Sequence, residues 1–237
     1  MTGSELKANA RKLIFDNTPR IFFISLLYVV LGLLVSWFTF RLPGNIDMQN
    51  MYERLSAGEM FNLTMIFSNF RLTGLFLAVL FSLFQPIFDV GFISYCFKIF
   101  RRQETSYKDI LDGFLYFLKV LLLFIIITAL IFLWSLLLII PGIIAAYRYR
   151  LAFYILLDDP SKCVIDCIKE SGSLMYGAKV DLLIIDISFL GWFFLDFLFF
   201  LLSPLPFTVP VVSVWLAPYI TLTRVGFYKQ RINRLAI

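Results

Sequence analysis

Residues 120–140 read VLLLFIIITALIFLWSLLLII and contain no charged side chain. A helix rises about 1.5 Å per residue, so a run of this length covers the roughly 30 Å of hydrocarbon in a bilayer. The run shows no alternation of apolar and polar residues, which a strand of a membrane barrel would need. It therefore predicts a transmembrane α-helix.

The composition of the whole chain agrees with this central helix. Of the 237 residues, 60% are hydrophobic and only 16% are charged, and Phe alone accounts for 28. Soluble proteins contain about 25% charged residues. A soluble core of this size has no room for so much apolar surface, whereas lipid accepts it. We therefore expect an all-α, polytopic membrane protein whose single transmembrane domain covers residues 1–237.

We predict six membrane spans, arranged as three hairpins. They lie at residues 21–40, 72–97, 120–140, 142–157, 180–202 and 209–227. The fourth is short and contains two arginines, so we expect it to be tightly packed or tilted. The outer loop 41–71 is the longest connector and is expected to carry a surface helix around residues 48–55, while the outer turns at 141–142 and 203–208 are short.

The distribution of basic residues predicts the orientation. Of the 21 Lys and Arg residues, Arg41, Arg54 and Arg71 fall in outer loops, Arg148 and Arg150 fall inside the fourth span, and the remaining 16 fall on one side of the membrane. Basic residues collect on the cytoplasmic side of membrane proteins. Both termini are therefore expected in the cytoplasm, and the basic clusters reflect topology rather than nucleic-acid binding.

Three short amphipathic stretches, residues 4–17, 106–118 and 159–176, each lead into a span. Such helices lie in the membrane interface, where their basic residues favour an anionic inner leaflet. We predict interfacial helices on the cytoplasmic side, and the sequence leaves open whether their recurrence is a repeat or a coincidence. The predicted helix starts are capping boxes at Thr2–Glu5 and Ser106–Asp109, and a cap at Asp159 followed by Pro160.

A candidate intramembrane polar cluster comprises Gln85, Asp89, Arg148, Arg150 and Asp186. Counted along straight helices, the four charged members fall in one slab, roughly 10–14 Å below the inner face. The two arginines point to opposite sides of their helix, so one could meet Asp89 and the other Asp186. Ionisable groups at such depth pair with one another or mark a functional site.

Two interpretations of this cluster remain open. It could form a polar cavity or relay that opens to the cytoplasm and holds an anion, a headgroup or protons. Alternatively, two buried Arg–Asp pairs could lock the short fourth span into the bundle. The balance of two acids and two bases favours the second interpretation, because buried pairs often specify packing.

The sequence offers no catalytic, cofactor-binding or metal-binding residues. It contains no histidine, which removes His-based nucleophile activation and His metal ligation. Cys96, Cys163 and Cys167 are expected to be reduced. Cys163 and Cys167 are expected to be small packing residues, because no further partners complete a zinc site. Neither Asp89 nor Asp186 has the Gly-flanked context of an intramembrane aspartyl protease.

Residues 132–160, FLWSLLLIIPGIIAAYRYRLAFYILLDDP, resemble a bacterial family of integral membrane proteins, the domain of unknown function 975 family. The likeness is carried by the run into Pro141-Gly142-Ile143, by residues 147–152, and by residues 153–156 before Pro160. Residues 6–11, 106–114 and 168–178 are similar to the same pattern. The resemblance implies a multi-span bacterial membrane protein and supplies no activity or ligand.

These observations lead to an expected function in the bacterial cytoplasmic membrane. We expect a non-enzymatic, multi-pass protein that works through contact with membrane lipids or as a scaffold for other membrane proteins, without nucleic acid. The alternative is a small transporter or permease that uses the Asp/Arg cluster as its site. A third alternative, an intramembrane hydrolase, has the least support in the residues.

Overall fold

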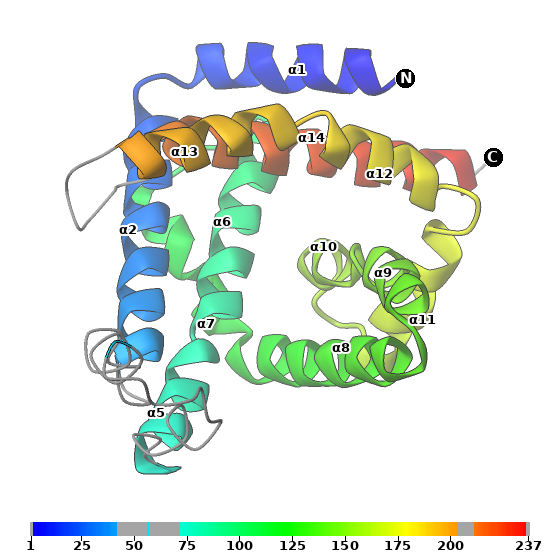
Figure 1. Cartoon of the computed structure of the whole chain (residues 1–237). Helices are drawn as coiled ribbons and strands as arrows, with labels where there is room; N and C mark the ends of the chain where they lie inside the picture. The colour runs from blue at the N-terminus through cyan, green and yellow to red at the C-terminus, as the bar shows by residue number, and fades with distance from the viewer. Residues whose placement is uncertain (1, 42–55, 57–71, 203–210, 236–237) are drawn as a thin grey trace. The chain divides into compact units, whose positions relative to one another are not determined.

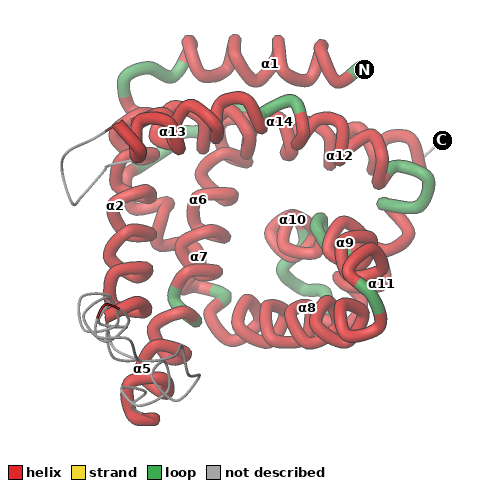
Figure 2. The backbone as a smooth tube through the Cα atoms, in the orientation of Figure 1, coloured by secondary structure: helices red, strands yellow, loops and turns green. Residues whose placement is uncertain are grey.

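The computed structural model describes residues 2–41, 56, 72–202 and 211–235, and every regular element in these ranges is a helix (Figures 1 and 2). The expected all-α class is therefore confirmed for the described part of the chain. The predicted surface helix at 48–55, nearly all of the outer loop 41–71 and the turn at 203–208 lie outside the described residues. The helices are α1 (Gly3–Asp16), α2 (Arg20–Arg41), α5 (Leu72–Ser82), α6 (Gln85–Phe100), the 3-10 helix η1 (Tyr107–Leu111), α7 (Asp112–Leu115), α8 (Phe117–Leu137), α9 (Ile139–Arg148), α10 (Ala152–Asp158), α11 (Val164–Leu174), α12 (Lys179–Ile187), α13 (Leu190–Leu202) and α14 (Val211–Leu235).

The chain divides into two compact units. The first comprises Met1–Val29 and Pro86–Ile237, and the second comprises Val30–Gln85. The second unit holds the later part of α2 together with α5, and there Gly32 leaves room for the side-chain amide of Gln85. All the other candidate site residues belong to the first unit.

Four helical segments are long and apolar enough to cross a membrane. They are Arg20–Trp37, Phe76–Phe100, Phe117–Leu137 and Ile139–Asp158, and they coincide with the first four predicted spans. The fifth predicted span, 180–202, consists of two helices, α12 and α13, which are separated by Ser188 and Phe189. The four segments fit a membrane protein, and their apolar length is the property that the sequence showed most directly.

The last predicted span is built around a proline. Pro218 lies inside α14 and has no N–H to donate, so the carbonyl of Val214 one turn earlier loses its helical partner. The hydroxyl of Ser25 in α2, which is fully buried, donates to that carbonyl instead. A backbone group that would be costly to leave unpaired in an apolar setting is thus satisfied across two helices.

The N-terminal amphipathic helix covers α14. Its predicted capping box is confirmed, since Thr2 and Glu5 exchange hydrogen bonds at the start of α1. Its apolar stripe, Leu6, Ala10 and Ile14, is buried, and α1 runs alongside α14 in the same unit (Figure 1). The stripe is therefore occupied by protein, where the sequence suggested an interface with lipid.

The second amphipathic stretch packs closely on α6. Its capping box at Ser106 and Asp109 is confirmed, but the segment forms the short elements η1 and α7 rather than one long helix. A Cβ atom on Gly91 would lie 1.9 Å from the carbonyl oxygen of Ile110, and one on Gly113 would lie 2.0 Å from that of Ile87. The glycines therefore allow backbone to approach backbone.

The third amphipathic stretch begins later than predicted, and the expected cap at Asp159 is wrong. Helix α11 starts at Val164 with Cys163 at its N-cap. Asp159 instead ends α10, and its carboxylate accepts hydrogen bonds from the backbone N–H and the hydroxyl of Ser161. A short aspartate side chain readily closes such a local turn, which competes with helix initiation.

Candidate functional site

A break in the fourth predicted span positions the site. Helix α9 ends at Arg148 and α10 begins at Ala152, with a turn between them. The buried hydroxyl of Ser171 on α11 donates to the carbonyl of Arg148 at 2.9 Å and accepts from the N–H of Leu151 at 3.2 Å. Ser171 therefore satisfies two backbone groups at the break, which lowers the cost of interrupting a helix in an apolar segment.

The two arginines at the break, Arg148 and Arg150, have different surroundings. The Arg148 side chain lies against α11, where a Cβ atom on Gly172 would come within 3.1 Å of its Nε. Arg150, in the turn itself, lines a cavity of about 450 Å3 in the first unit. The cavity is lined by Tyr28, Pro86, Asp89, Val90, Phe92, Ile93, Phe124, Ile127, Thr128, Ile131, Ala146, Tyr149, Arg150, Phe153, Tyr154, Thr221 and Arg224.

A second arginine of the cavity, Arg224 on α14, forms an ion pair with Asp186. Its Nε and Nη2 both donate to Oδ1 of Asp186, at 3.1 and 2.9 Å. The hydroxyl of Tyr147 donates to Oδ2 at 3.3 Å. The two charged side chains are only 14% and 20% exposed, for Asp186 and Arg224 respectively. The negative charge of Asp186 is thus compensated by Arg224. Asp186 lies near the end of α12, directly before the turn that separates α12 from α13.

Asp89 on α6 also lines the cavity. Its Oδ1 accepts a hydrogen bond of 2.9 Å from the hydroxyl of Tyr28 on α2. The Tyr28 ring stacks on Phe92, with 4.4 Å between the ring centroids. This stacking fixes the phenol, so the carboxylate is held at the cavity wall.

Arg150 is the cavity's available cation. Arg150 is exposed and lines the cavity, and none of the described carboxylates lies within ion-pair distance of its guanidinium. The neighbouring Arg224 is already paired, and several tyrosines and apolar side chains of α8 and α10 complete the wall. A guanidinium with free N–H donors in an apolar surrounding is suited to an oxyanion, which it binds through parallel hydrogen bonds.

The structure brings together part of the predicted cluster. Asp89 and Arg150 share the cavity, and Asp186 joins it through Arg224. The Arg148 side chain lies apart, against α11, and Gln85 belongs to the second unit. The expected partner of Asp186 was Arg148 or Arg150, and the structure pairs it with Arg224 instead.

The sequence did not identify Arg224 as a member of the cluster. It lies near the cytoplasmic end of a predicted span, so it was counted with the basic residues that indicate the orientation. Its isolation in the run 211–228, where it is the one charged residue, was a usable signal.

A further ion-pair centre lies outside the cavity, at Asp158. Its carboxylate forms an ion pair with Arg101, accepts two hydrogen bonds from Lys229 at 2.8 and 3.0 Å, and accepts one from Tyr228 at 3.0 Å. These contacts join the ends of α6 and α10 to α14.

The cysteines divide into two kinds. Cys96 and Cys167 are buried, as predicted for Cys167, and burial raises the pKa of the Cys167 thiol. Cys163 is exposed at the start of α11, so its predicted packing role is wrong. Over the described ranges, no group of three or more Cys, Asp or Glu side chains is placed to hold a metal ion.

Comparison with known proteins supports a family but no activity. No curated protein and no solved structure matches the chain. Residues 136–235 match the family model described as "Protein of unknown function (DUF975)". This region runs from the end of α8 to the end of α14 and includes Arg150, Ser171, Asp186 and Arg224. Over these residues the chain is similar to the DUF975 family.

Proposed function

We propose that this protein is a non-enzymatic, multi-pass protein of the bacterial cytoplasmic membrane that binds an anionic group inside the membrane, at Arg150. The chain crosses the membrane six times and keeps both termini in the cytoplasm. The anionic group is a phosphate or a group of similar shape, carried either by a lipid or by a small solute that the protein moves.

The topology rests on two observations. Four helical segments have the length and hydropathy of spans, and they agree with the first four predicted positions. The remaining two spans correspond to α12–α13 and α14. With six crossings, 15 of the 21 basic residues lie on the cytoplasmic side, once Arg224 is counted with Arg150 inside the membrane.

The anion-binding role rests on the environment of Arg150. An unpaired guanidinium is costly in an apolar setting, and a bound oxyanion offsets that cost. The two interrupted segments are in contact, because Tyr147 near the end of α9 donates to Asp186 near the end of α12 at 3.3 Å. Interrupted helices with charged groups at the break are typical of ligand sites in membrane transporters.

The test uses two arginines on one segment. Thermal unfolding of the detergent-solubilised chain is measured with inorganic phosphate and with dihexanoyl phosphatidic acid, for wild type, Arg150→Gln and the matched control Arg148→Gln. The proposal predicts stabilisation of wild type and of the control, and its loss in Arg150→Gln. A response to phosphate alone indicates a solute, and a response to the lipid only indicates a headgroup. Equal responses in all three proteins would refute the proposal.

A scaffold or accessory role is the second candidate, and the α8–α9 connection favours it. Five successive apolar residues there, residues 136–140, are 67–78% exposed. Apolar surface of this kind is covered by lipid or by another protein. Photo-crosslinking from position 137 in native membranes distinguishes the two, since a discrete protein adduct supports a scaffold and lipid adducts alone argue against it.

A further inference from the structure

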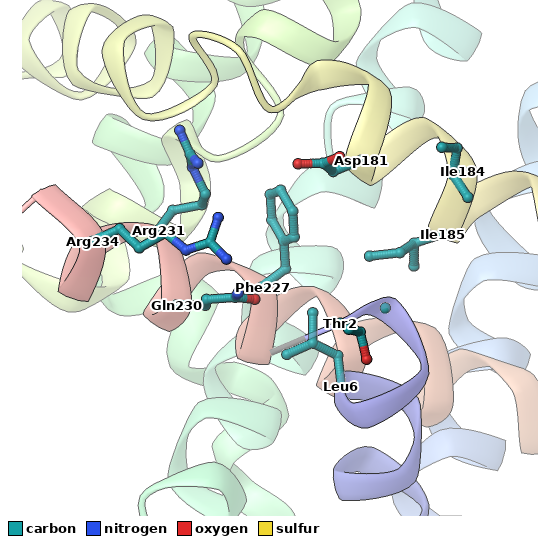
Figure 3. A pocket seen from close by; sticks show the side chains of 10 residues that line it. Thr2, Leu6, Asp181, Ile184, Ile185, Phe227, Gln230, Arg231 and Arg234 are labelled. Carbon is teal, nitrogen blue, oxygen red and sulfur yellow. The ribbon is translucent and has the colours of Figure 1, made fainter.

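A second cavity lies between α1, α12 and α14, away from Arg150. It measures about 350 Å3 and is shown in Figure 3, with Asp181 on α12 at one side and Arg231 and Arg234 on α14 at the other. Its inner wall is apolar, because Leu6, Ile185 and Phe227 are 4%, 5% and 3% exposed.

The cavity contains three charged side chains, of which one is fixed and two are unpaired among the described residues. Arg231 is held in place, since its Nε and Nη2 donate to the carbonyls of Leu174 at 2.9 Å and Tyr176 at 3.0 Å. Arg234 and Asp181 are both exposed, and neither forms an ion pair or hydrogen bond with any described residue. The cavity therefore presents a free cation and a free anion, with a second, fixed cation beside them.

We propose that this cavity binds a zwitterionic phospholipid headgroup that carries a phosphodiester and a primary ammonium. The Arg234 guanidinium donates to the phosphodiester oxygens, and Arg231 adds positive charge nearby. The ammonium donates to the Asp181 carboxylate, and the first acyl carbons lie against the apolar wall.

The pattern of charge selects this headgroup over others. A headgroup with negative charge only would leave Asp181 unmatched and close to the phosphate. A trimethylated ammonium has no N–H and cannot donate to the carboxylate. The inference rests on the topology given under the proposed function, which puts Asp181 at the start of the fifth span and Arg234 just beyond the sixth, both at the inner face.

The test compares three short-chain lipids that differ only in headgroup. Thermal unfolding of the detergent-solubilised full chain is followed against dihexanoyl phosphatidylethanolamine, phosphatidylcholine and phosphatidylglycerol. The ethanolamine lipid is expected to stabilise wild type at the lowest concentration. Arg234→Gln should raise its half-saturating concentration roughly tenfold, the effect of losing one charge-assisted hydrogen bond.

Matched variants distinguish binding at this cavity from a general effect of charge and from binding at Arg150. Asp181→Asn should abolish the preference for ethanolamine over glycerol headgroups, while Arg102→Gln, an exposed arginine outside the cavity, should respond like wild type. Arg150→Gln should also retain the ethanolamine response, so failure of the anion site and failure of this site give different results. Equal responses to the three headgroups, or an unchanged response in Arg234→Gln, would overturn the inference.

Discussion

Replacing Asp186 by asparagine removes the negative charge from a partly buried ion pair. Arg224 then keeps its positive charge next to Arg150, with no carboxylate to accept its Nε and Nη2 donors. Removing one partner of a buried pair costs about 3–5 kcal/mol. Because Asp186 and Arg224 are 14% and 20% exposed, the low end, about 3 kcal/mol, is the appropriate value.

For a chain of this length, about 3 kcal/mol corresponds to a fall in the midpoint of thermal unfolding of roughly 6–12 °C. The assay is unfolding in detergent, followed by intrinsic fluorescence, with Asp181→Asn as the control because that carboxylate is exposed and unpaired among the described residues. Exchanging the charges in Asp186→Arg/Arg224→Asp should recover at least half of the loss. If Asp186→Asn unfolds within 2 °C of wild type, roughly the shift of a surface substitution, the ion pair has no structural role.

Three further predictions concern the break, a close contact and the thiols. Ser171→Ala should lower the free energy of unfolding by about 1–3 kcal/mol by leaving two backbone groups of the break unpaired; an unchanged midpoint would contradict this. Gly91→Ala should sharply reduce the yield of folded protein, because its Cβ would lie 1.9 Å from the Ile110 carbonyl oxygen, and a normal size-exclusion profile would argue against that packing. Maleimide added from the cytoplasmic side should label Cys163 and should not label Cys167, whose thiol is buried and has a raised pKa. Labelling of both cysteines at equal rates would show that α11 is not packed as described.

The apolar spans were predictable because length and hydropathy decide them almost alone. Residues 120–140 have no alternative to a helix in an apolar solvent, and the segment Phe117–Leu137 has that form. The capping boxes at Thr2 and Ser106 were also predictable, because their partners lie three residues away. Local interactions of this kind can be inferred from spacing.

The helix breaks could not be predicted, because they depend on residues distant in sequence. The turn after Arg148 is stabilised by Ser171 on α11, and the proline-freed carbonyl of Val214 is satisfied by Ser25 on α2. Counting depth along straight helices therefore placed Arg148 with the cluster and omitted Arg224. The apolar stripe of α1 had a similar ambiguity, because an amphipathic pattern does not distinguish lipid from a protein partner.

Native mass spectrometry of the gently purified protein tests the proposed anion site most directly. Wild type and Arg148→Gln are expected to retain an adduct whose mass contains a phosphate group, and Arg150→Gln is expected to lose it. Because Arg148 and Arg150 lie two residues apart and carry the same charge, a general effect of basicity would act on both variants equally. The same adduct in all three proteins, or in none, would contradict the claim that Arg150 binds an anion within the membrane.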